Sequence, residues 1–135
     1  MHAKRLLLLS LILGTACKAP TPAEQLDSIL SWIGTARMVG DAWIRHTTPD
    51  KYSRQTLELS STTVGQISND LLKSPPPGID TAALDSVLTG SRAKIARMAA
   101  LITAKNAPAF ARELDSLHAD EKVLKRVSNS IESKQ

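Results

Sequence analysis

"SPPPGID", residues 74–80, is the stretch that divides this chain of 135 residues. Proline has no N–H to donate inside a helix, and its ring clashes with the preceding turn. Three prolines followed by glycine therefore end any helix at this point. On both sides of the stretch, apolar side chains recur at the spacing of helices. The stretch thus predicts two helical halves joined by one stiff connector.

The half before the connector contains two predicted helices, at about 22–46 and 49–73. Thr21 is suited to cap the first helix, because Pro22 follows it and Glu24 completes a capping box. Thr48, Pro49 and Asp50 repeat this start signal before the second helix. The apolar seams consist of Leu26, Ile29, Leu30, Ile33, Ala36, Gly40, Trp43 and Ile44 in the first helix and Leu57, Ser60, Val64, Ile67 and Leu71 in the second.

The half after the connector repeats the arrangement, with predicted helices at about 80–105 and 107–132. Asp80 is suited to cap the first of them, and Asn106–Pro108 interrupts the chain before the second. The seam residues alternate between steps of three and four, as in packed helices. They are Leu84, Leu88, Ser91, Ile95, Met98 and Ile102, followed by Phe110, Leu114, Leu117, Glu121, Leu124 and Ile131.

Four amphipathic helices of similar length predict an all-α domain over residues 22–135. Short connections force neighbouring helices to run antiparallel, so an up-down-up-down four-helix bundle is the expected fold. The alternative is a helical hairpin pair that dimerises. The chain has one cysteine, which cannot form an intramolecular disulfide, so packing must stabilise the domain.

The first 16 residues have the parts of an export signal. Lys4 and Arg5 precede an apolar run, Leu6–Leu13, and small residues follow it. The run is too short to cross a bilayer as a helix, which needs roughly 20 residues. Residues 1–16 are therefore interpreted as a signal peptide that is recognised and removed.

The stretch Leu13-Gly14-Thr15-Ala16-Cys17 resembles the lipobox of bacterial lipoproteins. The resemblance covers only the first 17 residues, and Gly14 stands where the lipobox usually has a large aliphatic residue. It implies that Cys17 receives a lipid and becomes the first mature residue, so that residues 17–21 form a lipidated tether. Lys18 lacks the acidic character of an inner-membrane retention signal, which favours the outer membrane if the host has two membranes. Cleavage after Ala16 by the ordinary signal peptidase, leaving a soluble periplasmic or secreted protein, is the alternative.

The charge balance argues against nucleic acid as a partner. The full chain has 17 basic and 13 acidic residues, a net charge of +4. Removing Lys4 and Arg5 with the signal leaves 15 − 13 = +2. A nucleic-acid-binding face needs densely clustered basic side chains with aromatic residues among them, and neither pattern is present.

A polar layer is predicted across the middle of the bundle. Antiparallel pairing of the last two helices places Ser91 at the height of Glu121, and pairing of the first helix with the last places Arg37 within a turn of His118 and Glu121. A buried charge is costly unless it is paired, so we expect an ion pair between Arg37 and Glu121, completed by Ser91 and His118. The layer has three interpretations: a buried site for a ligand, a structural layer that sets the register of the helices, or residues at the rim of the bundle that turn outward.

Neither a metal, nor another cofactor, nor a catalytic group is expected. Asp115, His118 and Glu121 share a helical face, but a di-iron bundle needs Glu-x-x-His motifs that this sequence lacks. Phosphate-binding loops, nucleophile elbows and zinc-protease motifs are also absent from the sequence. These absences predict a protein that is not an enzyme.

Three surfaces are candidates for contact with partners, and one of them, the pole away from the tether with residues 45–51 and 105–109, is best placed to meet another protein. Trp32, Val39 and Trp43 lie on a stripe beside the seam of the first helix, which either packs between neighbouring helices or binds a partner protein. Lys73 and Lys134 are expected beside the tether, where they would face lipid headgroups. The sequence therefore favours a membrane-anchored, non-enzymatic envelope lipoprotein that binds another envelope protein or acts structurally. The alternative is a carrier or sensor that holds a small ligand, a lipid or a metal between its helices.

Overall fold

Four helices make up most of residues 18–134, the part of the chain that this computed structural model describes. Their bounds differ by at most two residues from those that the sequence predicts. They are α2 (Pro22–Ile44), α3 (Asp50–Lys73), α4 (Thr81–Thr103) and α5 (Ala107–Glu132). The signal segment and Cys17 lie outside the described residues. Between residues 18 and 134, no helix is both long and apolar enough to span a membrane.

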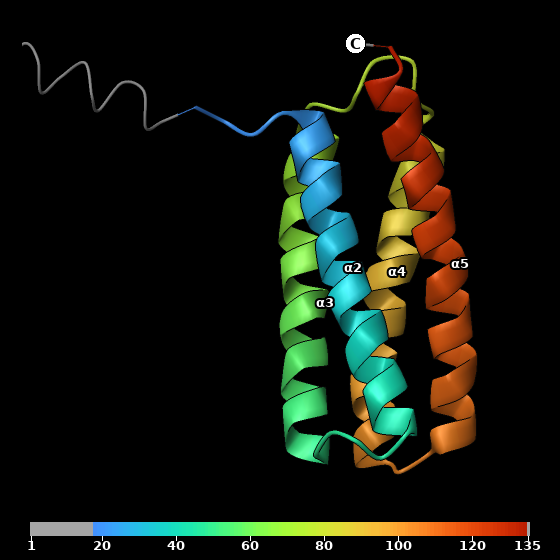
Figure 1. Cartoon of the computed structure of the whole chain (residues 1–135). Helices are drawn as coiled ribbons and strands as arrows, with labels where there is room; N and C mark the ends of the chain where they lie inside the picture. The colour runs from blue at the N-terminus through green and yellow to red at the C-terminus, as the bar shows by residue number, and fades with distance from the viewer. Residues whose placement is uncertain (1–17, 135) are drawn as a thin grey trace, which may run out of the picture.

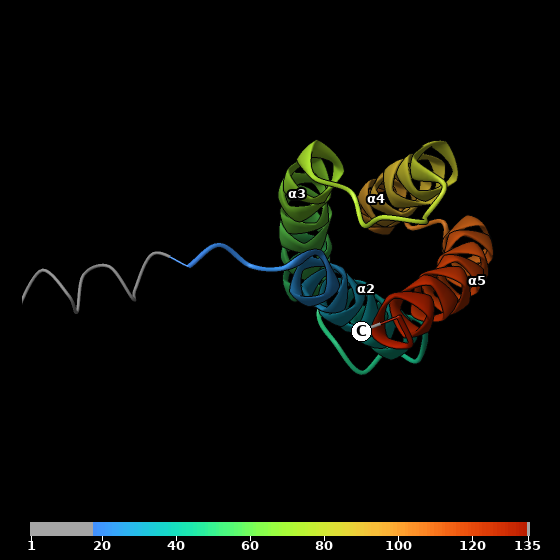
Figure 2. The same cartoon turned by 90° about the horizontal axis from the view of Figure 1, so that it is seen from above.

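The helices pack in a ring in which each contacts its neighbours in the sequence, and α5 closes the ring against α2. Consecutive helices run in opposite directions (Figure 1), and the view along the bundle shows the ring (Figure 2). The predicted all-α, up-down-up-down bundle is therefore confirmed. Few contacts cross the ring, and they join α2 to α4.

Local sequence explains where the helices begin. The Thr21 side chain accepts a hydrogen bond from the Glu24 N–H at 3.2 Å, and Asp80 accepts one from the Ala83 N–H at 3.1 Å. Asn106 caps α5 in the same way through the Ala109 N–H. In contrast, Pro49 occupies the cap position of α3 and provides no side-chain hydrogen bond.

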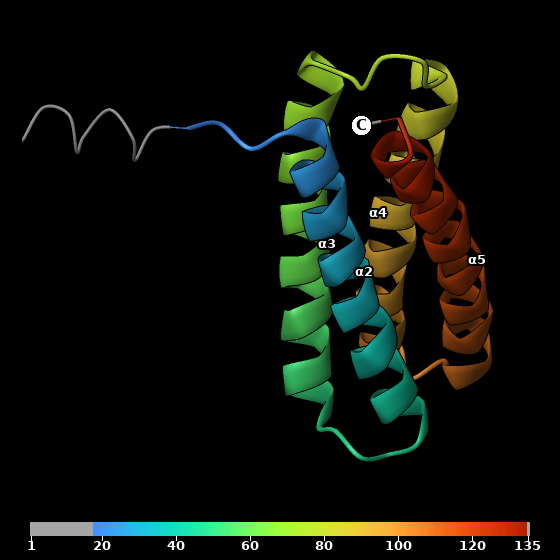
Figure 3. The same ribbon diagram turned by 45° about the horizontal axis from the view of Figure 1, so that its top comes forward.

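The two ends of the bundle differ in their connections (Figure 3). The tether pole carries residues 18–21, the connector 74–80 and the end of α5. The distal pole carries the turns that join α2 to α3 and α4 to α5. Both distal turns place a basic residue in the left-handed region, His46 with φ 58° and Lys105 with φ 53°. The amides of His46 and Thr47 bond back to Trp43 and Ala42, a Schellman motif that ends the helix.

The core is aliphatic, with one buried aromatic side chain, Phe110. All four helices contribute fully buried residues, such as Leu26, Leu57, Ile95 and Leu117. Several serines occupy buried positions on α3 and α4. They are Ser53, Ser60, Ser61, Ser68 and Ser91.

Candidate functional site

The ion pair expected between Arg37 and Glu121 is present in the bundle. Arg37 Nε lies 3.1 Å from Glu121 Oε2, and Lys125 Nζ lies 2.8 Å from Glu121 Oε1. The Glu121 side chain is 4% exposed, whereas that of Arg37 is 31% exposed. Burial by itself would raise the pKa of the Glu121 carboxyl, but hydrogen bonds and charge from Lys125 and Arg37 outweigh it and lower the pKa. Glu121 is therefore an anion at neutral pH.

Ser91 belongs to a different cluster from the one that the sequence predicts. Its hydroxyl has one proton to donate, which the Val87 carbonyl at 2.8 Å and Asp120 Oδ2 at 3.1 Å share as acceptors. Lys94 Nζ lies 2.6 Å from the same Asp120 oxygen. Lys94 and Asp120 are 19% and 17% exposed, so this cluster lies at the edge of the core between α4 and α5.

His118 was expected in the polar layer, and this expectation is wrong. The residue is exposed. Matching positions along the axes of two helices does not specify which way each side chain points. Successive residues point about 100° apart around a helix. His118 lies three positions before Glu121 and so points about 60° away from it around the helix, which is enough to turn the imidazole out of the α2–α5 interface.

Lys94 and Asp120 are the residues that the sequence interpretation missed. The same comparison of heights that paired Arg37 with Glu121 also brings them together, if it is applied to residues that flank the seam. It would likewise have found Arg97 and Glu113, whose Nε and Oε1 atoms lie 3.0 Å apart. Paired charges beside the seam are typical of packed helices.

The tryptophans do not form an open surface. Val39 is buried, and Trp32 and Trp43 are half-buried against the core. The Trp43 ring packs on Phe110 with centroids 4.5 Å apart, and its Nε1 donates to Asp50 Oδ1 at 2.8 Å. The stripe thus packs between neighbouring helices and closes the distal pole.

Side chains that could bind a metal do not converge in residues 18–134, where no group of three or more His, Cys, Asp or Glu side chains could hold an ion. Asp115 and His118 are both exposed, whereas Glu121 is buried. The three side chains therefore do not share one environment.

The two poles differ in charge. Four acids, Glu24, Asp70, Asp80 and Glu132, accompany Lys18, Lys73 and Lys134 at the tether pole. The expected basic surface beside the tether is therefore balanced by acids. At the distal pole the turns and adjoining helix ends carry Arg45, Lys51 and Lys105, all exposed, with Asp41 and Asp50 as the acids among them. Asp41 is paired with Arg37 of its own helix.

Comparisons with models of protein families, with curated proteins and with solved structures found no match for this chain.

Proposed function

We propose that this protein is a non-enzymatic lipoprotein of the cell envelope, anchored through Cys17, that binds an acidic surface of another envelope protein with its distal pole. The observation that carries this proposal is the basic charge of the distal pole, which lies at the opposite end of the bundle from the tether.

The distal cations are available to a partner. Arg45, Lys51 and Lys105 are exposed, and within residues 18–134 none of them is in an ion pair. Asp50, one of the two acids beside them, already accepts a hydrogen bond from Trp43. Exposed charges of one sign steer an oppositely charged partner and fix its orientation.

The dimensions fit a module that holds this pole away from a membrane. Residues 18–21 reach at most ~14 Å when extended. The 23 residues of α2 extend ~34 Å further at 1.5 Å per residue. A lipidated Cys17 would thus keep the tether pole near the bilayer and leave the distal pole facing other proteins.

The chemistry of the buried groups supports a role without catalysis. Glu121 has a lowered pKa and both its oxygens have protein partners, so it is unsuited to donate a proton at neutral pH. The Ser91 hydroxyl is also satisfied by protein atoms. The polar layer supports the structural interpretation better than a ligand site.

Two experiments test the proposal. Cys17→Ser should move the protein from the membrane fraction to the soluble fraction of its host, and the proposal fails if the variant stays with the membranes as the wild type does. Salt should not release the wild type, because the proposed anchor is held by burial of its acyl chains, which salt does not screen.

The distal surface is tested by reversing its charges. The triple variant Arg45→Glu, Lys51→Glu, Lys105→Glu should lose the crosslinks that the wild type forms with its partner in intact cells. The matched control is Lys122→Glu with Arg126→Glu, which changes exposed cations on the side of α5. This control should keep the crosslinks with the partner. Equal crosslinking by both variants would exclude the distal pole as the contact surface.

A further inference from the structure

The seam between α4 and α5 has two unlike halves. Toward the distal pole, two ion pairs close it: Arg97 with Glu113, and Lys94 with Asp120. Toward the tether pole, apolar side chains replace the charged ones. There the seam opens into a cavity of about 240 Å³, which we call the apolar slot.

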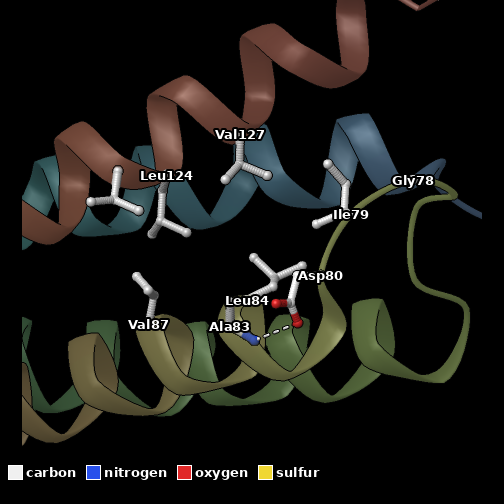
Figure 4. Close-up of a pocket in the computed structure, with 9 residues that line it drawn as sticks. Gly78, Ile79, Asp80, Ala83, Leu84, Val87, Leu124 and Val127 are labelled. Carbon is white, nitrogen blue, oxygen red and sulfur yellow. Dashed lines mark hydrogen bonds between the residues drawn. The ribbon is translucent and has the colours of Figure 1, made fainter.

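The walls of the apolar slot come from three elements (Figure 4). Ala83 and Val87 lie one turn apart on α4 and face Val127 of α5, while Ile79 from the connector lines the end nearest the tether pole. Val123, one turn before Val127, completes the α5 wall and is 37% exposed. The fully buried Leu124 and the nearly buried Leu84 border the slot on the core side.

The apolar slot adjoins a second cavity farther toward the tether pole. The second cavity, of about 140 Å³, shares Ile79 with the slot and is lined by Ile131 one turn beyond Val127. Along the two cavities together, the α5 side chains extend from Val123 to Ile131, a rise of eight residues or ~12 Å. Apolar surface along such a length favours a linear aliphatic chain, whose burial removes both surfaces from water.

A cation stands at the outer end of this apolar path. Lys134 lines the second cavity, is exposed, and has no ion pair within residues 18–134. Asp80, the acid that borders the slot, accepts a hydrogen bond from the Ala83 N–H, and the positive end of α4 offsets its charge. A ligand that complements this charge would place an anionic head group at Lys134.

We infer that the apolar slot binds a single aliphatic chain with an anionic head, of the fatty-acid type, with the chain between α4 and α5 and the carboxylate at Lys134. The inference goes beyond the proposed function and does not depend on it, because it requires neither the anchor nor the distal pole.

The probe is sodium decanoate, titrated below its micelle concentration into the full chain carrying Cys17→Ser. Titration calorimetry should show saturable binding of one decanoate per chain, and acetate should not bind. Val123→Glu should weaken decanoate binding at least tenfold by placing a charge in the wall. Leu59→Glu, the same change at an exposed leucine of α3, should leave it unchanged. Absence of saturable binding, or equal affinity in Val123→Glu and wild type, would overturn the inference.

Further variants test the slot without the charge that Val123→Glu introduces. Ala83→Trp should fill the slot and block decanoate, whereas Ala82→Trp, at the neighbouring position that does not line the slot, should not. Lys134→Gln should weaken decanoate several-fold but leave nonyl maltoside, which has the same alkyl chain and a neutral head, unaffected. An equal effect on both ligands would refute the role of Lys134. If the unliganded protein sediments as a dimer that Val123→Glu dissociates, the slot is filled by a second copy and the inference is wrong.

Discussion

Asp120 and Glu121 are adjacent in the sequence but join α5 to different helices. Asp120 binds Lys94 and Ser91 of α4, whereas Glu121 binds Arg37 of α2. Consecutive residues point about 100° apart around a helix, so two neighbouring acids can face the two neighbours of α5 in the ring. Together they tie α5 into the bundle at mid-height, where their pairings specify which side of α5 faces which helix.

The half-buried pair between Lys94 and Asp120 should matter more for stability than the exposed one between Arg97 and Glu113. Asp120→Ala leaves a largely buried ammonium without its partner and should lower the free energy of unfolding by about 1–3 kcal/mol. Glu113→Ala frees an Arg97 side chain that is 53% exposed, so the loss should stay within about 1 kcal/mol. Urea denaturation of both variants checks this order, and equal losses would contradict it.

The stabilising effect of Glu121 should depend on pH. Its pKa is lower in the folded protein, so the unfolded chain takes up the proton first as the pH falls. The stabilisation is fully present above the ordinary glutamate pKa of about 4.3 and is lost as the pH falls through the folded value. The free energy of unfolding of wild type minus that of Glu121→Gln should therefore be larger at pH 7 than at pH 3. A difference that is constant between these values would show that the carboxylate gains nothing from Arg37 and Lys125.

Helix periodicity and capping residues were enough to predict the four helices and their order. The signals are local: Thr21, Asp80 and the prolines at 75–77 act within a turn of their own positions. The polar layer required more, because a pairing between helices depends on height and on direction. Comparing positions along the helix axes correctly placed Arg37 beside Glu121. The same comparison paired Ser91 with Glu121, whereas its partner is Asp120, and it predicted a buried His118, which is exposed.

The apolar slot had no comparable sequence signal. Val87, Val123 and Val127 are ordinary residues at the edge of a helix seam, and any of them could be covered by a neighbour. The space between them depends on how far apart α4 and α5 lie near the connector, which is a property of the packed bundle. The structure was needed to reveal it.

The distal turns contain residues that are conformationally strained, and glycine should relieve this. Lys105 has φ 53°, a region that costs a residue with a β-carbon about 1–2 kcal/mol. Lys105→Gly should raise the free energy of unfolding by up to about 1 kcal/mol, because the greater entropy of unfolded glycine offsets part of the gain. Ala104→Gly is the control, since Ala104 has φ −75° and gains no relief. If thermal melting shows the two variants equally destabilised, the left-handed turn carries no strain.

Two glycines of α2 should respond oppositely to the same substitution. A β-carbon added at Gly34 meets no atom within 4 Å, so Gly34→Ala should stabilise the protein by about 0.5–1 kcal/mol through helix propensity. At Gly40 the β-carbon would lie 3.0 Å from both Leu114 Cδ1 and Met98 Cε, where α2 meets α5 and α4.

Those two side chains are buried, so Gly40→Ala should overpack the core and cost about 1–3 kcal/mol, which exceeds the gain in propensity. Because the propensity gain is common to both variants, the difference between their free energies of unfolding measures the close approach of α2 to its neighbours. Urea denaturation gives both values. Equal stabilisation of the two variants would mean that the core can yield around Gly40, and that this glycine is not required for the helices to pack.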